Sequence, residues 1–235
     1  MSFSGFPQTG LDFFKKLRKK NTREWFEAHK DDYLTQCRAP MEEFVVEVNQ
    51  ALAKFAPEHI AEPKKAIYRI YRDTRFSANK TPYKTHIAAY FPRTGMDKNV
   101  GAGFYFTVSD EKMEIAAGVH MAGAEQLAAI RGHILDTHAE LKKIATNKKT
   151  VELMGALKGE SLRKVPRGFP AESAAADFLR MKQWIFFESF DPAVALTPES
   201  VPFVTSRLKA MASLVNYLNT PLLRMVKERT AEGMF

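Results

Sequence analysis

The stretch GAGFYFTVSDEKMEIAAGV, residues 101–119, decides the fold expected for this chain. It holds two short runs rich in aromatic and aliphatic residues, joined through the turn-forming pair Asp110 and Glu111. Runs of this composition with a short polar link are typical of a β-hairpin, and links this short join antiparallel strands. The stretch therefore predicts antiparallel strands near the middle of the chain.

Helical patterns precede this hairpin. Residues 1–60 carry apolar side chains at helical spacing. Thr9 is the predicted cap of a first helix, and the pattern NTRE at 21–24 predicts a second helix with Asn21 as its cap. Pro40 suits the first turn of a further helix, since proline lacks the N–H that a first turn leaves unpaired. This part of the chain is predicted to form a helical layer.

Strand-like runs fill residues 63–119, including AIYRIYR at 66–72. Residues 120–235 indicate helices around one further strand, KQWIFFESF at 182–190. They end in a last helix over 197–219 with Thr197 as its cap, although Pro202 suggests a slightly later start. No repeat or linker divides the chain. The predicted fold is a single α+β domain, residues 1–235, in which N-terminal and C-terminal helices cover a mostly antiparallel sheet.

Composition narrows the class of protein. The chain has 235 residues, of which 45% are hydrophobic and 26% charged, values typical of a globular domain with its own core. Cys37 is the one cysteine, so an intramolecular disulfide is excluded and a reducing, cytoplasmic location is expected. A basic leader followed by an apolar core is missing, as is a run of about 18 apolar residues, so no membrane span is expected. No cofactor and no metal site is predicted, because phosphate-binding, dinucleotide-binding and metal-ligand spacings are missing.

The positive charge of the chain is concentrated in one region. The net charge is +8, and residues 61–95 hold eight basic and two acidic residues, a local charge of +6. Its densest part is RIYRDTRFSANKTPYK, residues 69–84. A local excess of this kind attracts phosphates, nucleic acid or acidic partners. If 66–72 is a strand, its arginines converge on one small anion only where the chain turns within DTRFSANKTP.

The same segment carries a family resemblance. Its spacing resembles the signature RxxRDxRFxx(D/N)KxxY of domain-of-unknown-function family 2461, a family of bacterial proteins of about this length. The resemblance extends over the chain, through residues 6–33, 101–106, 116–121 and 164–182. His120 departs from it, since an aromatic such as tryptophan is expected there. The family has no assigned activity, so the resemblance implies a set of residues only: Arg69, Arg72, Asp73, Arg75, Phe76, Asn79, Lys80 and Tyr83.

Three hypotheses follow for the basic segment. The first is an anion-binding module for a phosphate-bearing small molecule or nucleic acid, with aromatic side chains such as Tyr68, Tyr71, Tyr83, Tyr90 and Phe91 beside the charge. Phe76 is expected in the core. The predicted ligand-binding residues are Arg69, Arg72, Asp73, Arg75, Asn79, Lys80, Tyr83 and Lys84.

The second hypothesis is an enzyme acting on a small phosphorylated or carboxylated substrate, with Asp73 or Tyr83 available for proton transfer. No nucleophile and no other catalytic residue is assigned. The third is a structural ion-pair network in a partner-binding protein. In that case, Arg72→Ala is expected to lower stability by about 3 kcal/mol or more if it leaves Asp73 unpaired in the interior. The sequence does not specify the oligomeric state.

Overall fold

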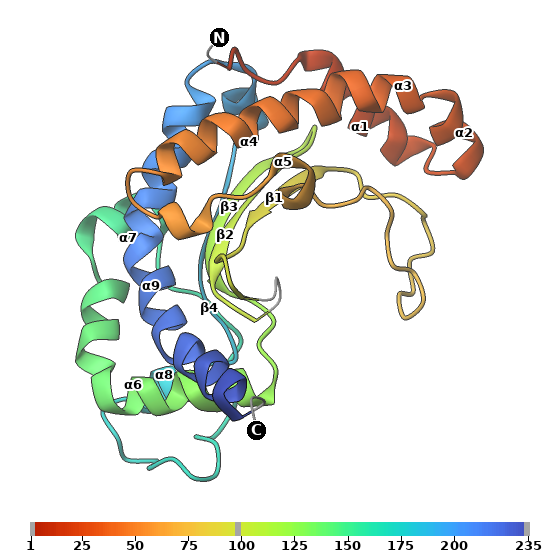
Figure 1. Ribbon diagram of the computed structural model, residues 1–235. Helices are drawn as coiled ribbons and strands as arrows, with labels where there is room; N and C mark the ends of the chain where they lie inside the picture. Colours follow the sequence, from red (N-terminus) through yellow and green to blue (C-terminus); the bar gives the residue numbers. More distant parts are fainter. Residues whose placement is uncertain (1–2, 97–99, 233–235) are drawn as a thin grey trace. The chain divides into compact units, whose positions relative to one another are not determined.

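The computed structural model describes residues 3–96 and 100–232 of the chain (Figure 1). These residues divide into two compact units. The first unit consists of residues 3–91, 105–115 and 189–206. The second unit consists of residues 92–96, 100–104, 116–188 and 207–232. The chain passes between the units several times, and the expectation of a single domain stays a prediction.

The N-terminal part of the first unit is helical, as predicted. Its elements in chain order are α1 (Gln8–Lys19), α2 (Arg23–Ala28), α3 (Lys30–Tyr33), the π-helical turn η1 (Leu34–Arg38), α4 (Ala39–Leu52), the 3-10 turn η2 (Pro57–His59) and α5 (Pro63–Ala66). Pro40 lies in the first turn of α4, which continues directly from η1, since Arg38 and Ala39 both have helical backbone angles. Buried side chains of α1 and α4, among them Leu17 and Phe44, contribute to the core of the unit.

Two predicted helix caps are wrong. Helix α1 begins at Gln8, directly after Pro7, so Thr9 lies inside the first turn, where its hydroxyl donates to the side chain of Gln36. The cap of α2 is Thr22, whose hydroxyl accepts a hydrogen bond from the backbone N–H of Trp25 at 3.3 Å. The Asn21 side chain instead forms hydrogen bonds with the backbone of Tyr83. Thr9 and Asn21, which local spacing assigns to helix capping, therefore form tertiary hydrogen bonds instead.

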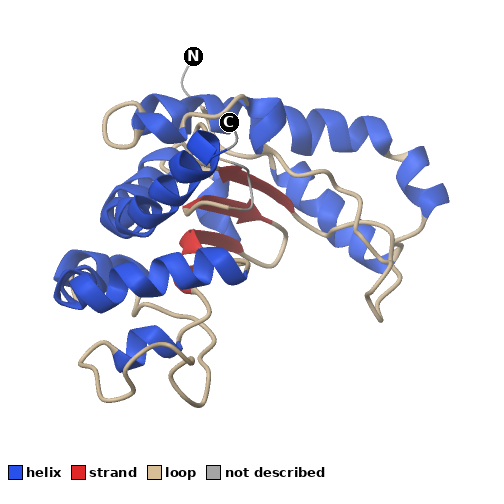
Figure 2. Ribbon diagram, turned by 60° about the horizontal axis from the view of Figure 1, so that its bottom comes forward, coloured by secondary structure: helices blue, strands red, loops and turns tan. Residues whose placement is uncertain are grey.

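The sheet has four antiparallel strands in the order β1-β2-β3-β4, which confirms the predicted fold class (Figure 2). Its strands are β1 (Ile87–Phe91), β2 (Gly103–Val108), β3 (Met113–Val119) and β4 (Trp184–Phe190). The predicted hairpin is the β2–β3 pair, closed by the backbone N–H of Ser109 donating to the carbonyl of Lys112 at 2.9 Å. Aromatic side chains join this hairpin to α4, because the rings of Phe106 and Phe44 stack 4.4 Å apart.

The predicted strand over AIYRIYR is wrong. Its first residue, Ala66, ends the short helix α5, and the rest of the run makes only isolated antiparallel bridges, Ile67 with Ala89 and Tyr71 with Tyr83. Buried positions fall at Ala66, Ile67 and Ile70, a spacing that does not alternate. The arginines of this run therefore do not follow the two faces of a strand.

The remaining elements follow the predicted order. They are α6 (Ala124–Ala145), α7 (Lys148–Met154), α8 (Ala176–Arg180), the 3-10 turn η3 (Pro192–Leu196) and α9 (Ser200–Glu232). Helix α9 begins at Ser200, as the alternative from Pro202 suggests, so Thr197 is not its cap and its hydroxyl donates to the carbonyl of Val194 instead. The helix ends later than predicted and continues through Pro221. Leu218 and Leu222, on either side of that proline, are fully buried, and their burial offsets the hydrogen bond that proline cannot donate. None of the helices in the described ranges is long and apolar enough to cross a membrane.

Candidate functional site

Residues 69–84, called the arm from here on, form an irregular loop of the first unit that folds back on itself (Figure 1). The backbone N–H of Arg72 donates to the carbonyl of Pro82 at 2.9 Å, and that of Lys84 donates to Ile70 at 2.8 Å. Around the tip, the Asn79 side chain accepts hydrogen bonds from both the backbone N–H and the hydroxyl of Thr81. The chain therefore does turn within DTRFSANKTP.

The base of the arm is attached to the N-terminal helices through Asn21 and Phe26. The Asn21 amide donates to the carbonyl of Tyr83 and accepts from its N–H, both at 3.0 Å, as a neighbouring strand would. The Tyr83 ring is 2% exposed and stacks on Phe26, with 4.2 Å between ring centroids. These contacts hold the arm beside α2.

A pocket of about 500 Å³ lies between α2 and the arm. Its lining combines three cationic side chains, one carboxylate and two tyrosine rings: Arg23, Glu27, Tyr71, Arg72, Thr74, Lys80, Pro82 and Tyr83. Arg72, Lys80 and Tyr83 are predicted ligand-binding residues. The pocket therefore gathers positive charge from two elements that are about 50 residues apart in the sequence.

Uncharged oxygen atoms hold the two arm cations of this pocket in place. The Arg72 guanidinium donates to the hydroxyls of Thr81, at 2.6 Å, and Ser77, at 3.4 Å. The Lys80 ammonium donates to the carbonyl of Thr74 at 2.9 Å. Within residues 3–96 and 100–232, no carboxylate lies within ion-pair distance of Arg72 or Lys80. Neutral oxygens therefore orient the two cations, and no described carboxylate neutralises their charge.

Asp73 and Arg75 form a pair of their own. The guanidinium of Arg75 donates two hydrogen bonds to the Asp73 carboxylate, at 3.1 and 2.7 Å, and the Arg75 backbone N–H donates a third at 3.2 Å. These hydrogen bonds lower the pKa of Asp73 to about 2, which makes it a poor proton acceptor at neutral pH. The condition under which Arg72→Ala would leave Asp73 unpaired in the interior is not met, because Asp73 is exposed and its partner is Arg75.

This pair predicts a pH dependence confined to strong acid. An unfolded aspartate titrates near a pKa of about 3.9, so the stabilisation from the pair is present above about pH 4 and is lost as the pH falls through 2. We expect the side-chain carboxyl signal of Asp73 to titrate near pH 2 in an NMR experiment. In Arg75→Gln, the midpoint should return toward about 4. An unchanged midpoint in that variant would contradict the pairing.

The other predicted residues lie outside the pocket lining. Arg69 is exposed, Asn79 holds the turn, and the Lys84 ammonium lies 5.1 Å from the centroid of the Tyr68 ring. Phe76, expected in the core, is 95% exposed, and the guanidinium carbon of Arg75 lies 5.8 Å from its ring centroid. That expectation is wrong because the tip of the arm packs against no core, so the ring has no apolar surface to cover it.

Sequence reasoning missed Arg23 and Glu27, which α2 supplies. The two residues are four positions apart, a spacing that places them on one face of a helix. That spacing shows that the two side chains share a face of the helix, but it does not show what this face contacts. Tyr71 was considered only as one of several aromatic residues near the charge, and the structure makes it a half-exposed wall of the pocket.

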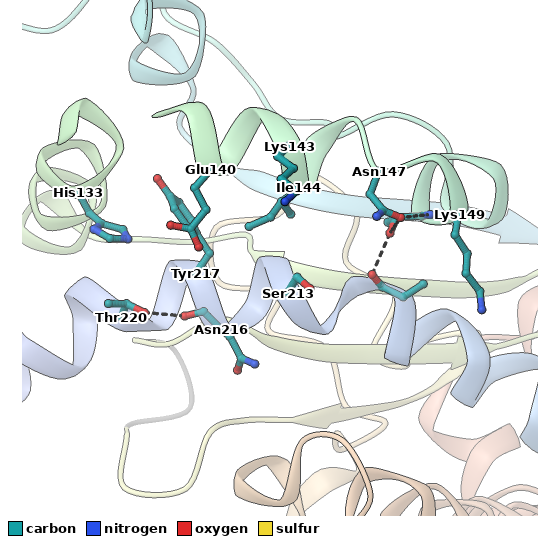
Figure 3. A pocket seen from close by; sticks show the side chains of 12 residues that line it. His133, Glu140, Lys143, Ile144, Asn147, Lys149, Ser213, Asn216, Tyr217 and Thr220 are labelled. Atoms are coloured by element: carbon teal, nitrogen blue, oxygen red, sulfur yellow. Dashed lines mark hydrogen bonds between the residues drawn. The ribbon is translucent and has the colours of Figure 1, made fainter. Parts of the chain in front are cut away.

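A second pocket, of about 680 Å³, belongs to the second unit (Figure 3). Helices α6 and α9 supply most of its lining, and side chains of both charge signs lie along it, among them Glu140, Lys143 and Lys149. Several of its polar groups are committed to the protein. The Tyr217 hydroxyl lies 2.8 Å from the hydroxyl of Thr137, and the Thr150 hydroxyl donates to the Ala210 carbonyl at 2.9 Å. This pocket is the weaker candidate for an anion site, because two lysines face one carboxylate here, whereas three cations face one carboxylate beside α2.

His133 lies at one end of this second pocket. Its ring centroid is 4.6 Å from that of Tyr217, and burial lowers the pKa of the imidazole. The part of the chain that the structure describes places no group of three or more histidine, cysteine, aspartate or glutamate side chains where they could hold a metal ion.

Comparison with known proteins gives one match. No curated protein matches the chain, and no solved structure matches it. A family model described as Conserved hypothetical protein (DUF2461) matches residues 9–217, so the chain belongs to this family.

Proposed function

We propose that the pocket between α2 and the arm binds the phosphate group of a phosphate-bearing ligand. The observation that carries the proposal is that the Arg72 guanidinium and the Lys80 ammonium donate hydrogen bonds to uncharged oxygens and to no carboxylate among the described residues. Arg23 adds a third cation to the lining, and Glu27 is its one carboxylate. A guanidinium that is held in place donates two parallel hydrogen bonds to a phosphate without a further loss of conformational entropy.

Binding of inorganic pyrophosphate, measured by calorimetry at low and at moderate salt, tests this proposal. We expect Arg72→Gln to weaken binding about 10- to 150-fold, because a hydrogen bond to a charged group contributes about 1.5–3 kcal/mol. Lys80→Gln should also weaken pyrophosphate binding. Affinity should fall as salt rises, since the attraction between the charges is screened.

Arg75→Gln is the matched control. It removes a guanidinium from the same arm, but from one that already pairs with Asp73. We expect this variant to weaken pyrophosphate binding by less than Arg72→Gln does, because Arg75 lies outside the pocket lining and its loss acts only through the solvent-screened charge of the exposed Asp73. Equal losses in Arg72→Gln and Arg75→Gln would show attraction to net charge without a defined site. A wild-type protein that does not bind pyrophosphate would overturn the proposal.

A further inference from the structure

Phe76 is the most exposed large hydrophobic side chain among the residues that the structure describes. Its ring is 95% exposed at the tip of the arm, and the next, Met121, is 79% exposed. The Arg75 guanidinium carbon lies 5.8 Å from the ring centroid, and the Asp73 carboxylate holds that guanidinium in place. An aromatic ring with a planar cation beside it is therefore presented to solvent.

This aromatic face lies close to the proposed phosphate pocket. Thr74, two residues before Phe76, belongs to the lining of that pocket. Because successive Cα atoms are about 3.8 Å apart, the Cα atoms of Thr74 and Phe76 are at most about 7.6 Å apart. Tyr71, 47% exposed, lines the same pocket. A chain molecule whose phosphate is in the pocket therefore needs to extend only a short distance to meet the part of the arm that carries Phe76.

We propose that the arm binds single-stranded nucleic acid, with a backbone phosphate on Arg72 and Lys80 and an unpaired base stacked on Phe76. This inference rests on the proposed function and names the class of its ligand. Single-strand binding sites combine cationic side chains along the backbone with aromatic faces that accept bases of any sequence. A paired base offers no free face, so a duplex does not satisfy this arrangement.

The chemistry of the tip favours a nucleic acid over a lipid surface. Membrane insertion depends on the apolar area that is buried, and the residues around Phe76 at the tip are Thr74, Arg75, Ser77, Ala78 and Asn79, of which Ala78 alone is apolar. Tyr83 and Phe91, two of the aromatic residues near the charge, are buried in the protein and have no free face for a base. Stacking is therefore assigned to Phe76.

Fluorescence anisotropy with a labelled oligothymidylate of about twelve nucleotides tests the inference, since this length covers one single-strand site. We expect Phe76→Ala to weaken oligonucleotide binding about 5- to 150-fold, the range for loss of one stacked base. Phe76→Tyr keeps the ring and should bind as the wild type does. Since Phe76 is almost fully exposed, neither variant should alter folding. An oligouridylate run in parallel shows whether RNA or DNA is bound more tightly.

Pyrophosphate separates the failure of this inference from the failure of the proposed function. We expect Phe76→Ala to bind pyrophosphate as the wild type does while losing oligonucleotide affinity. If pyrophosphate binds but the oligonucleotide affinity is the same in Phe76→Ala, the inference is overturned and the phosphate pocket stands. If pyrophosphate does not bind at all, the proposed function fails first. Binding of anionic phosphatidylglycerol vesicles through Phe76, with no oligonucleotide binding, would replace the nucleic acid with a membrane surface.

Discussion

Gly118→Ala is expected to lower the free energy of unfolding by about 3 kcal/mol or more. Gly118 lies in β3 with a φ angle of +132°, a conformation that side chains with a Cβ rarely adopt. A Cβ at this position would also overlap the backbone carbonyl oxygen of Trp184 in β4, which cannot move without disturbing the strand pair. Backbone strain and steric overlap therefore act together at one residue.

Urea unfolding followed by circular dichroism measures this effect, and Gly132→Ala is the matched control. Gly132 lies inside α6, and a Cβ there meets no atom within 4 Å. The same substitution should therefore raise stability by about 0.5–1 kcal/mol, since alanine loses less backbone entropy in a helix than glycine does. If the two variants had equal stability, the close approach of β3 and β4 at Gly118 would be contradicted.

Tyr83→Ala is expected to lower the free energy of unfolding by about 3 kcal/mol, the usual cost of deleting a buried aromatic ring. Tyr83 is 2% exposed, and its ring stacks on Phe26 and lies 5.3 Å from the ring of Tyr71. The variant should also lose pyrophosphate binding, because Tyr83 forms a wall of the pocket and the base of the arm. Thermal unfolding and calorimetry on the same protein measure both effects.

Tyr83→Phe separates the ring from the hydroxyl. Burial raises the pKa of the phenol, so the hydroxyl is neutral at neutral pH and is not poised to exchange a proton. We expect this variant to be within about 1 kcal/mol of the wild type in stability, because the stacked ring is kept. It should still bind pyrophosphate. A variant that is stable but loses turnover of a phosphorylated substrate would instead support the enzyme hypothesis.

The predictable part of the fold is the part governed by local patterns. The hairpin at 101–119 and the N-terminal helices follow from residue spacing, since side chains repeat every two residues along a strand and every 3.6 along a helix. The AIYRIYR run misled because its aromatic and β-branched residues suit a strand, whereas a helical turn beginning at Pro63 ends at Ala66 and only isolated bridges follow. A composition typical of strands is not enough to form one, because a strand also needs a neighbouring strand with which to form continuous backbone hydrogen bonds.

The predictable part of the site is its charge. Arg72, Lys80 and Tyr83 were selected from the sequence and do line the pocket. The other five predicted residues do not, because they pair with each other, hold the turn or point elsewhere. The exposure of Phe76 could not be predicted from the sequence, since a phenylalanine is buried more often than not. Composition does not show that the tip of the arm packs on no core.

The sequence by itself determined the α+β class, the hairpin and the position of the charged segment. Each of these depends on residues that are close together in the chain. Only the tertiary structure decided which charges are compensated, which aromatic ring is exposed and that α2 supplies Arg23. Asn21 illustrates the reason: local spacing makes it a helix cap, but Tyr83, 62 residues later, offers it two backbone hydrogen bonds. Contacts of that kind depend on packing, which no local pattern encodes.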